Sequence, residues 1–233
     1  MENQTYPGNG SVPAVNSAAL AKAFINKVYL WMAVCMLLTA GVAAYTAQDQ
    51  SCILWTLNNV LLLSLCTLGI VVVMSFAANR LTSGALTVLL LAFAGIQGML
   101  FGPLLVAYGM DSVAKAFGCT AVMFGAMSIY GSVTKRNLSA VGRACLMILI
   151  GLILASIINI FLGSSTMDFI ISFVGVIIFA LFTAYDTQRL LEIGMSEDET
   201  VRSKGAVLGA LTLYLDFINL FLMLLRFFGG RDE

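Results

Sequence analysis

The sequence contains no histidine, and this absence restricts both its chemistry and its response to pH. Histidine is the one side chain whose ordinary pKa lies near neutrality. A response between about pH 6 and 8 must therefore come from carboxyl groups or, less readily, from a thiol. Serine and cysteine nucleophiles also lose their usual general base, so hydrolysis by those nucleophiles is excluded.

The sequence also has few charged residues. Charged residues make up 10% of the chain, whereas a soluble domain has about 25%. Twelve basic residues balance twelve acidic ones without any basic tract, so nucleic acid is not an expected partner. The five cysteines form no CxxC pair, and we therefore expect no disulfide framework, no zinc site and no cofactor.

What the chain has instead is apolar length: 60% of its residues are hydrophobic, and its mean hydropathy is +0.97. Seven apolar runs are each long enough for a membrane-spanning helix, which needs about 18 residues or more. Strands are set aside, because an open sheet edge cannot be satisfied in lipid and the runs lack the alternation of a barrel. The sequence predicts an all-α membrane protein with seven spans, at 28–47, 53–78, 85–108, 116–133, 144–162, 169–190 and 205–228.

The first segment, residues 1–21, is polar and holds two of the three prolines. It has no basic stretch followed by an apolar core and a cleavage site, so we interpret it as a flexible cytoplasmic tail and not as a signal peptide. Residues 22–233 are then expected to form a single seven-helix transmembrane domain.

Basic residues are distributed unequally between the two sides that these spans define. Nine lie on the side of the amino terminus and three on the other. Because basic residues concentrate in cytoplasmic loops, we predict a cytoplasmic amino terminus and an external carboxyl terminus. The nine are Lys22, Lys27, Arg80, Lys135, Arg136, Arg143, Arg189, Arg202 and Lys204, and the three are Lys115, Arg226 and Arg231.

The last apolar run contains one acid, Asp216, near its middle. Asp216 lies about 16 Å along a helix from Gly205, which places it near the midplane of a ~30 Å hydrocarbon core. A carboxylate there costs about 2.5–3.5 kcal/mol on insertion scales, so it is a candidate functional group. The structural alternative is that Asp216 is protonated and only hydrogen-bonds a neighbouring helix.

A second acid, Asp186, ends the preceding run and is the expected partner of Asp216. On this topology Asp186 lies near the inner boundary and Asp216 about 5–10 Å deeper, a mismatch that helix tilt or a longer sixth helix would close. If they meet, the two carboxyl groups should share a proton, because both cannot ionise cheaply in a desolvated site. Protonation of the pair would then act as a switch.

Other polar residues are predicted to support this pair. Arg80 ends the second run at the expected level of Asp186, where it is either a latch that pairs with Asp186 or an ordinary cytoplasmic anchor. Arg226 is expected to anchor the outer end. The remaining candidates share a face with one of the acids or adjoin it in the sequence, and they are Thr183, Tyr185, Thr212 and Asn219.

Three segments carry a resemblance to a known family. AYDTQRL at 184–190, LGALTLYLDFINLFLMLLRFFG at 208–229 and MFGAMSIYGSVTKRNLS at 123–139 resemble the bacterial branch of the Bax inhibitor-1/YccA family. The resemblance implies six helices wrapped around a central seventh. It also implies a pH-sensitive calcium leak governed by Asp186 and Asp216, which would bind calcium transiently, with Arg80 as the latch. Some relatives carry an acid within the second helix, and residues 53–78 contain none.

These observations leave three candidate functions to compare. A calcium leak is favoured, because carboxylate oxygens suit a hard cation. A regulatory membrane protein is the alternative, since the family's bacterial branch is also associated with modulating a membrane-bound ATP-dependent protease. An intramembrane aspartyl protease fails on its motif, because Asp216 follows Leu-Tyr-Leu in place of Gly-x-Gly and no Pro-Ala-Leu occurs. We therefore do not expect an enzyme. The expected location is the bacterial inner membrane.

Overall fold

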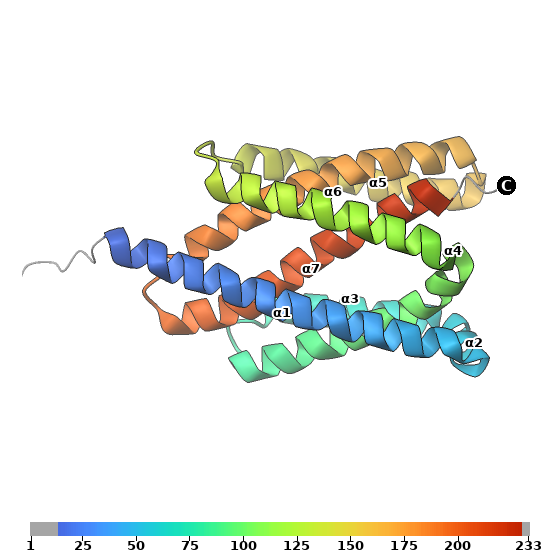
Figure 1. The fold of residues 1–233 in the computed structure, drawn as a ribbon, viewed down its shortest axis with the longest axis horizontal. Coiled ribbons are helices and arrows are strands. Elements are labelled where there is room, and N and C mark those ends of the chain that lie inside the picture. Colours follow the sequence, from blue (N-terminus) through green and yellow to red (C-terminus); the bar gives the residue numbers. More distant parts are fainter. Residues whose placement is uncertain (1–13, 230–233) are drawn as a thin grey trace, which may run out of the picture.

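The computed structural model describes residues 14–229, and within them it contains helices and short connections but no strand. The all-α prediction is confirmed. Figure 1 shows the helices lying roughly along one long axis, as in a membrane bundle. Their bounds are α1 Ala14–Gln48, α2 Gln50–Asn58, α3 Val60–Phe76, α4 Ser83–Val133, α5 Ser139–Leu162, α6 Ser165–Gly194 and α7 Glu199–Gly229.

Helix α4 is two helices joined at a reversal. Its 51 residues would extend about 75 Å if straight, more than twice the thickness of a bilayer core. Gly109 has φ 71° and ψ 154°, a non-helical conformation that glycine adopts without steric cost. The chain turns back there (Figure 1), so the two halves correspond to the third and fourth predicted spans.

The second predicted span is not one continuous helix. It is broken into α2 and α3, which meet at an angle of 71°. The break lies at Asn59, whose side-chain Nδ2 donates to the carbonyl of Trp55 at 2.8 Å. An asparagine side chain that hydrogen-bonds nearby backbone competes with the helical pattern, which accounts for a break inside an apolar run.

Five helices of the described chain are long and apolar enough to cross a membrane, or six when α2 and α3 count as one span. Separating the two halves of α4 gives the seven crossings that the sequence predicts. Chain ends 14 and 229 accordingly lie at opposite ends of the bundle (Figure 1). The connections at 77–82, 134–138 and 195–198 lie at the first of these ends.

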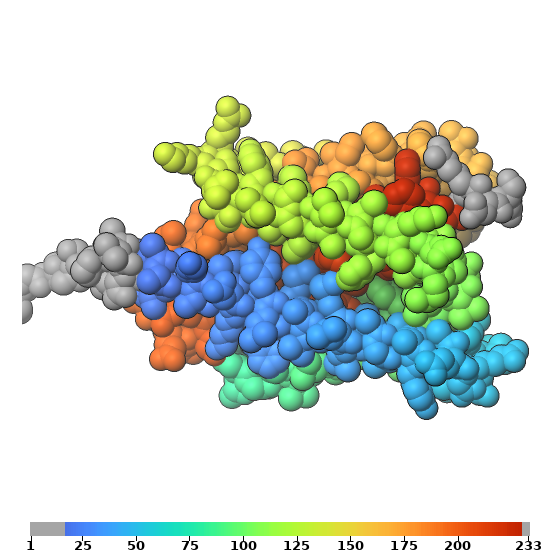
Figure 2. Space-filling view, viewed as in Figure 1, coloured from blue at the N-terminus to red at the C-terminus, as the bar shows by residue number. Residues whose placement is uncertain are grey.

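Helix α7 is the central helix. Of its most apolar stretch 67% is buried, against 17–44% for the other candidate spans. It packs against α1, α4 and α6, while α3 packs chiefly on α4 and α5 on α6. Figure 2 shows α1 and α4 covering most of α7 in that view. A single wrapped helix therefore provides the core, and its side chains Leu213, Tyr214 and Leu220 are fully buried.

The amino-terminal boundary differs from the sequence prediction. Helix α1 begins at Ala14, inside the segment expected to be a tail, and Ala21 is already buried. The backbone of Ala21 and the ring of Phe24 pack against Gly194 at the end of α6, where a side chain would collide with them. Residues 14–21 therefore belong to the helical domain, and the rest of the predicted tail lies outside the described residues.

Candidate functional site

Helices α6 and α7 bring Asp186 and Asp216 together. The two helices run antiparallel, and glycines on α7 allow a close approach: Leu190 packs on Gly209 and Ile193 on Gly205. In this register Asp216 lies on α7 about one helical turn from the position directly opposite Asp186. Helix α6 continues past the predicted end of its span to Gly194, so Asp186 lies about 12 Å from the end of the helix.

The side chains of Asp186 and Asp216 lie within hydrogen-bonding reach of each other. Asp186 is 8% exposed and Asp216 6%. Because a carboxylate has no proton to donate, a hydrogen bond between them requires at least one protonated carboxyl group. Within the described residues, Oδ2 of Asp216 is buried without a hydrogen-bond partner.

The neighbours of Asp186 in the sequence fix its position from several sides. The ring of Tyr185 lies against Gly142 of α5, where a side chain would collide with it. Thr187 is fully buried, and its hydroxyl donates to Ser128 of α4 at 3.4 Å. Successive residues of α6 therefore contact α5, α7 and α4, so the aspartate cannot shift independently of three neighbouring helices.

Gln188 extends this anchoring to the loop between α4 and α5. Its amide nitrogen donates to the carbonyl of Arg136 at 3.0 Å. Its amide oxygen accepts from the backbone N–H of Leu138 at 2.9 Å. The resembling segments at 123–139 and 184–190 are thus in direct contact.

The Arg80 latch is not formed in this structure. Arg80 is exposed in the connection between α3 and α4, and it makes no ion pair within residues 14–229. The neighbouring carbonyls of Ala78 and Asn79 accept hydrogen bonds from Nζ of Lys204 at 3.1 and 3.2 Å. Lys204 precedes Asp216 by about 18 Å of helix, so this loop lies well away from the aspartates.

The predicted supporting residues act mainly within their own helices. The hydroxyl of Thr183 donates to the carbonyl of Phe179 at 2.9 Å, and that of Thr212 to the carbonyl of Leu208 at 3.1 Å. Asn219 is half-buried. Beyond it, the side chain of Met223 packs on Gly175 of α6, which closes the α6–α7 interface on the side of the pair nearer the end of α7.

A buried network that the sequence analysis missed involves Tyr214. This side chain is fully buried, and its hydroxyl lies 2.8 Å from Oγ1 of Thr39 in α1. Thr39 in turn donates to the carbonyl of Ala94 in α4 at 2.9 Å, so the tyrosine is the donor to Thr39. The network ties α7 to α1 and α4. Tyr214 points about 160° away from Asp216 on α7, so the polar stripe through Asp216 gave no sign of it.

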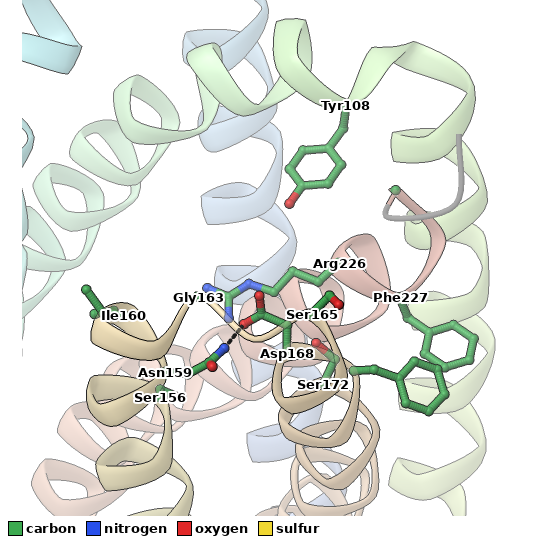
Figure 3. A pocket seen from close by; sticks show the side chains of 12 residues that line it. Tyr108, Ser156, Asn159, Ile160, Gly163, Ser165, Asp168, Ser172, Arg226 and Phe227 are labelled. Carbon is green, nitrogen blue, oxygen red and sulfur yellow. Dashed lines mark hydrogen bonds between the residues drawn. The ribbon is translucent and has the colours of Figure 1, made fainter. Parts of the chain in front are cut away.

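A cleft of about 650 Å³, lined by polar, charged and apolar side chains, lies at the other end of the bundle. Figure 3 shows Arg226 of α7 and Asp168 of α6 facing each other in it. Asn159 of α5 donates to Oδ1 of Asp168 at 2.7 Å. The predicted outer anchor Arg226 therefore lines a cleft, and neither Asp186 nor Asp216 is among the residues that line it.

The described residues offer few side chains that could together coordinate a metal ion. Within residues 14–229 no group of three or more His, Cys, Asp or Glu residues could hold a metal ion. Calcium takes six to eight oxygen ligands, so the two aspartates could supply only part of its shell. A cation at the pair would need water or backbone carbonyls as well.

These features define a multi-pass helical membrane protein whose buried central helix carries one member of an acid pair. Comparison with known proteins identifies the family within this class. The family model described as Inhibitor of apoptosis-promoting Bax1 matches residues 21–233. The chain therefore belongs to this family, the Bax inhibitor-1/YccA family, and the resemblance noted in the sequence is confirmed.

Similar proteins occur in distant bacteria. The chain is 42% identical to the inner membrane protein YbhL of Escherichia coli K12, with 97% of this chain and 98% of that protein covered. An uncharacterized protein of Deinococcus radiodurans is also 42% identical, over 91% and 92% of the two chains. An uncharacterized membrane protein of Streptococcus pyogenes serotype M3 is 42% identical over 70% and 71%.

Proposed function

We propose that the protein is a pH-sensitive cation leak of the bacterial inner membrane, with calcium as the expected ion and the Asp186–Asp216 pair as its gate. The observation that carries this proposal is the juxtaposition of two buried carboxyl groups on adjacent helices. Such a pair in the middle of an apolar bundle is expensive, and intramembrane acids characteristically serve ion or proton pathways.

The gate follows from the proton that the pair shares. While one proton remains, the hydrogen bond links α6 to α7 across their most closely packed segment. Loss of that proton removes the donor and leaves two negative charges in contact at low dielectric, where their repulsion is strong. The contact must then separate or accept a cation. Protons and cations compete for the same oxygens, so occupancy of the pair by a cation rises with pH.

Two closures account for the low exposure of the pair in this structure. On the outer side, Met223 packs on Gly175 between the cleft and the pair. On the inner side, α6 and α7 are packed together at Leu190 and Gly209. We propose that both contacts loosen when the aspartates separate, because both lie on the same pair of helices.

The orientation that we propose is a cytoplasmic amino terminus. The nine basic residues of the predicted inner side belong to the end of the bundle where α1 begins or to the loops beside it, and such a concentration is typical of the cytoplasmic face. The inner membrane location rests on this topology and on similarity to YbhL, whose name describes an inner membrane protein.

The second candidate function is a non-transporting regulator that modulates a membrane-bound ATP-dependent protease. The first turns of α1 project beyond the rest of the bundle (Figure 1), which would give a partner an accessible helical surface. Ion flux separates the two candidates. Purified protein in sealed vesicles should conduct calcium with a pH-dependent rate if the first is right, and should conduct none if only the second is right.

A further inference from the structure

The outer cleft holds charges of both signs in a fixed arrangement. The carboxylate of Asp168 is held through Oδ1 by Asn159, which is itself 4% exposed. Asn159 also bonds both the N–H and the carbonyl of Ser164, at 3.1 Å each. The second oxygen of Asp168 is left without a hydrogen bond within the described chain. A buried asparagine therefore orients this carboxylate toward the cleft.

The opposite charge comes from Arg226 on α7, which lines the same cleft (Figure 3). Within residues 14–229 no ion pair joins Arg226 to Asp168. Ser165 also lines the cleft and begins α6, so its backbone N–H is one of those without an intrahelical acceptor and contributes partial positive charge. One part of the cleft therefore suits an anion, and Asp168 suits a cation.

A further observation points to a ligand. Ser172 is 2% exposed and lines the cleft, yet its hydroxyl has no hydrogen-bond partner within the described residues. Because the side chain opens onto the cleft, this hydroxyl is free to hydrogen-bond a ligand or water there. The hydroxyl of Tyr108, whose ring lies over Gly229, points into the same space in Figure 3.

The rim of the cleft is apolar. Ile160 is 78% exposed and Phe169 50% exposed, and both lie on membrane-spanning helices. The ring of Phe169 packs against Phe227 with centroids 5.3 Å apart. The cleft thus combines a polar interior at the membrane boundary with a side that faces lipid chains.

We propose that this cleft binds the phosphoethanolamine headgroup of a membrane phospholipid. The phosphate would be recognised by Arg226 and the first turn of α6, because guanidinium groups and helix N-termini are suited to phosphate. The primary ammonium would donate to Asp168. A quaternary ammonium has no N–H to donate, and a glycerol headgroup has no positive charge, so the site distinguishes phosphatidylethanolamine from phosphatidylcholine and phosphatidylglycerol.

The test is native mass spectrometry of the purified full chain in detergent, with the three lipids added in equal amounts. Phosphatidylethanolamine should be the dominant adduct. Asp168→Asn and Arg226→Gln should each weaken its binding about tenfold, the equivalent of one charge-assisted hydrogen bond. Asp111→Asn and Lys115→Gln are matched controls, because both residues are exposed outside the cleft, and they should bind the lipid like the parent.

Several results would overturn the proposal. Equal binding of the three lipids by the parent would remove the headgroup recognition. An unchanged preference in both cleft variants would place the lipid elsewhere. Soluble glycerophosphoethanolamine is the last arm: if it binds as tightly as the lipid, the ligand is a water-soluble phosphoamine and not a lipid. Melting temperatures of the variants, measured in the same detergent, show whether each remains folded.

Discussion

The aspartate pair and the cleft at the other end of the bundle are built from the same two helices, and each contains an acid of α6 facing a polar residue of α7. At the pair, acid meets acid in a site that is almost closed. At the cleft, acid faces base beside about 650 Å³ of open space. Burial and charge thus separate two kinds of behaviour along one interface. On the proposed account the buried pair holds a proton, whereas the open pair keeps both charges and offers them to a ligand.

Close packing should matter most near the aspartate pair, and Gly131→Ala should show the largest effect. A methyl group at Gly131 would overlap the backbone carbonyl of Ala184, next to Tyr185 and Asp186. Because backbone cannot yield cheaply, we expect a loss of about 1–3 kcal/mol in unfolding free energy. Gly125→Ala on the same helix meets nothing within 4 Å and should be neutral or slightly stabilising. Equal melting temperatures for the two variants would contradict the close approach.

The buried network around Tyr214 should show the next largest effect. Tyr214→Phe removes the hydrogen bond to Thr39, and we expect a loss of about 1 kcal/mol in unfolding free energy. Tyr45→Phe is the control, because Tyr45 is 69% exposed. A drop in melting temperature restricted to Tyr214→Phe supports the network, and the same drop in both variants argues against it.

A smaller difference should separate the two cations near the end of α3. Lys204→Ala removes two hydrogen bonds to the carbonyls of Ala78 and Asn79 and should cost about 0.5–1.5 kcal/mol. Arg80→Ala removes no such contact and should change stability by less than about 0.5 kcal/mol. If Arg80 nevertheless acts as a latch in another conformation, Arg80→Ala will raise calcium leak at neutral pH while leaving the melting temperature unchanged.

The smallest effect is expected when a change in the cleft is measured through the aspartate pair. Arg226→Gln changes the cleft but lies about 15 Å along α7 from Asp216, so the pH profile of calcium flux should keep its midpoint. Flux measured in vesicles from about pH 6 to 8 checks this. A shifted midpoint would show that the cleft and the pair are electrostatically coupled.

Composition and spacing were sufficient to predict the helical class, the seven crossings and the pairing of Asp186 with Asp216, because apolar run length and a lone acid are local features of a sequence. The break at Asn59 was not anticipated, since the surrounding residues are apolar enough for a continuous span. The sequence pattern predicts Arg80 at the level of Asp186 with the sixth span ending at residue 190, whereas α6 extends to Gly194.

Contacts between distant segments could not be predicted from the sequence patterns. The approach of Gly131 to Ala184 and the link from Tyr214 to Thr39 depend on how three helices cross. The sequence pattern treats Lys204 as one more cytoplasmic basic residue, whereas the fold shows its hydrogen bonds to the connection between α3 and α4. The sequence does not distinguish Asp168 from other acids, because an acid at the start of a helix is common. Only the fold places Asp168 opposite Arg226.

The most direct test of the gate is calcium flux into vesicles containing the parent, Asp186→Asn or Asp216→Asn, measured from about pH 6 to 8. Asparagine cannot take part in the shared titration, so each variant should lose the pH dependence of the parent. Asp111→Asn, an exposed acid outside the pair, should retain it. If both pair variants are folded and keep the parent's pH profile, the titrating group lies elsewhere and the aspartate pair is not the gate.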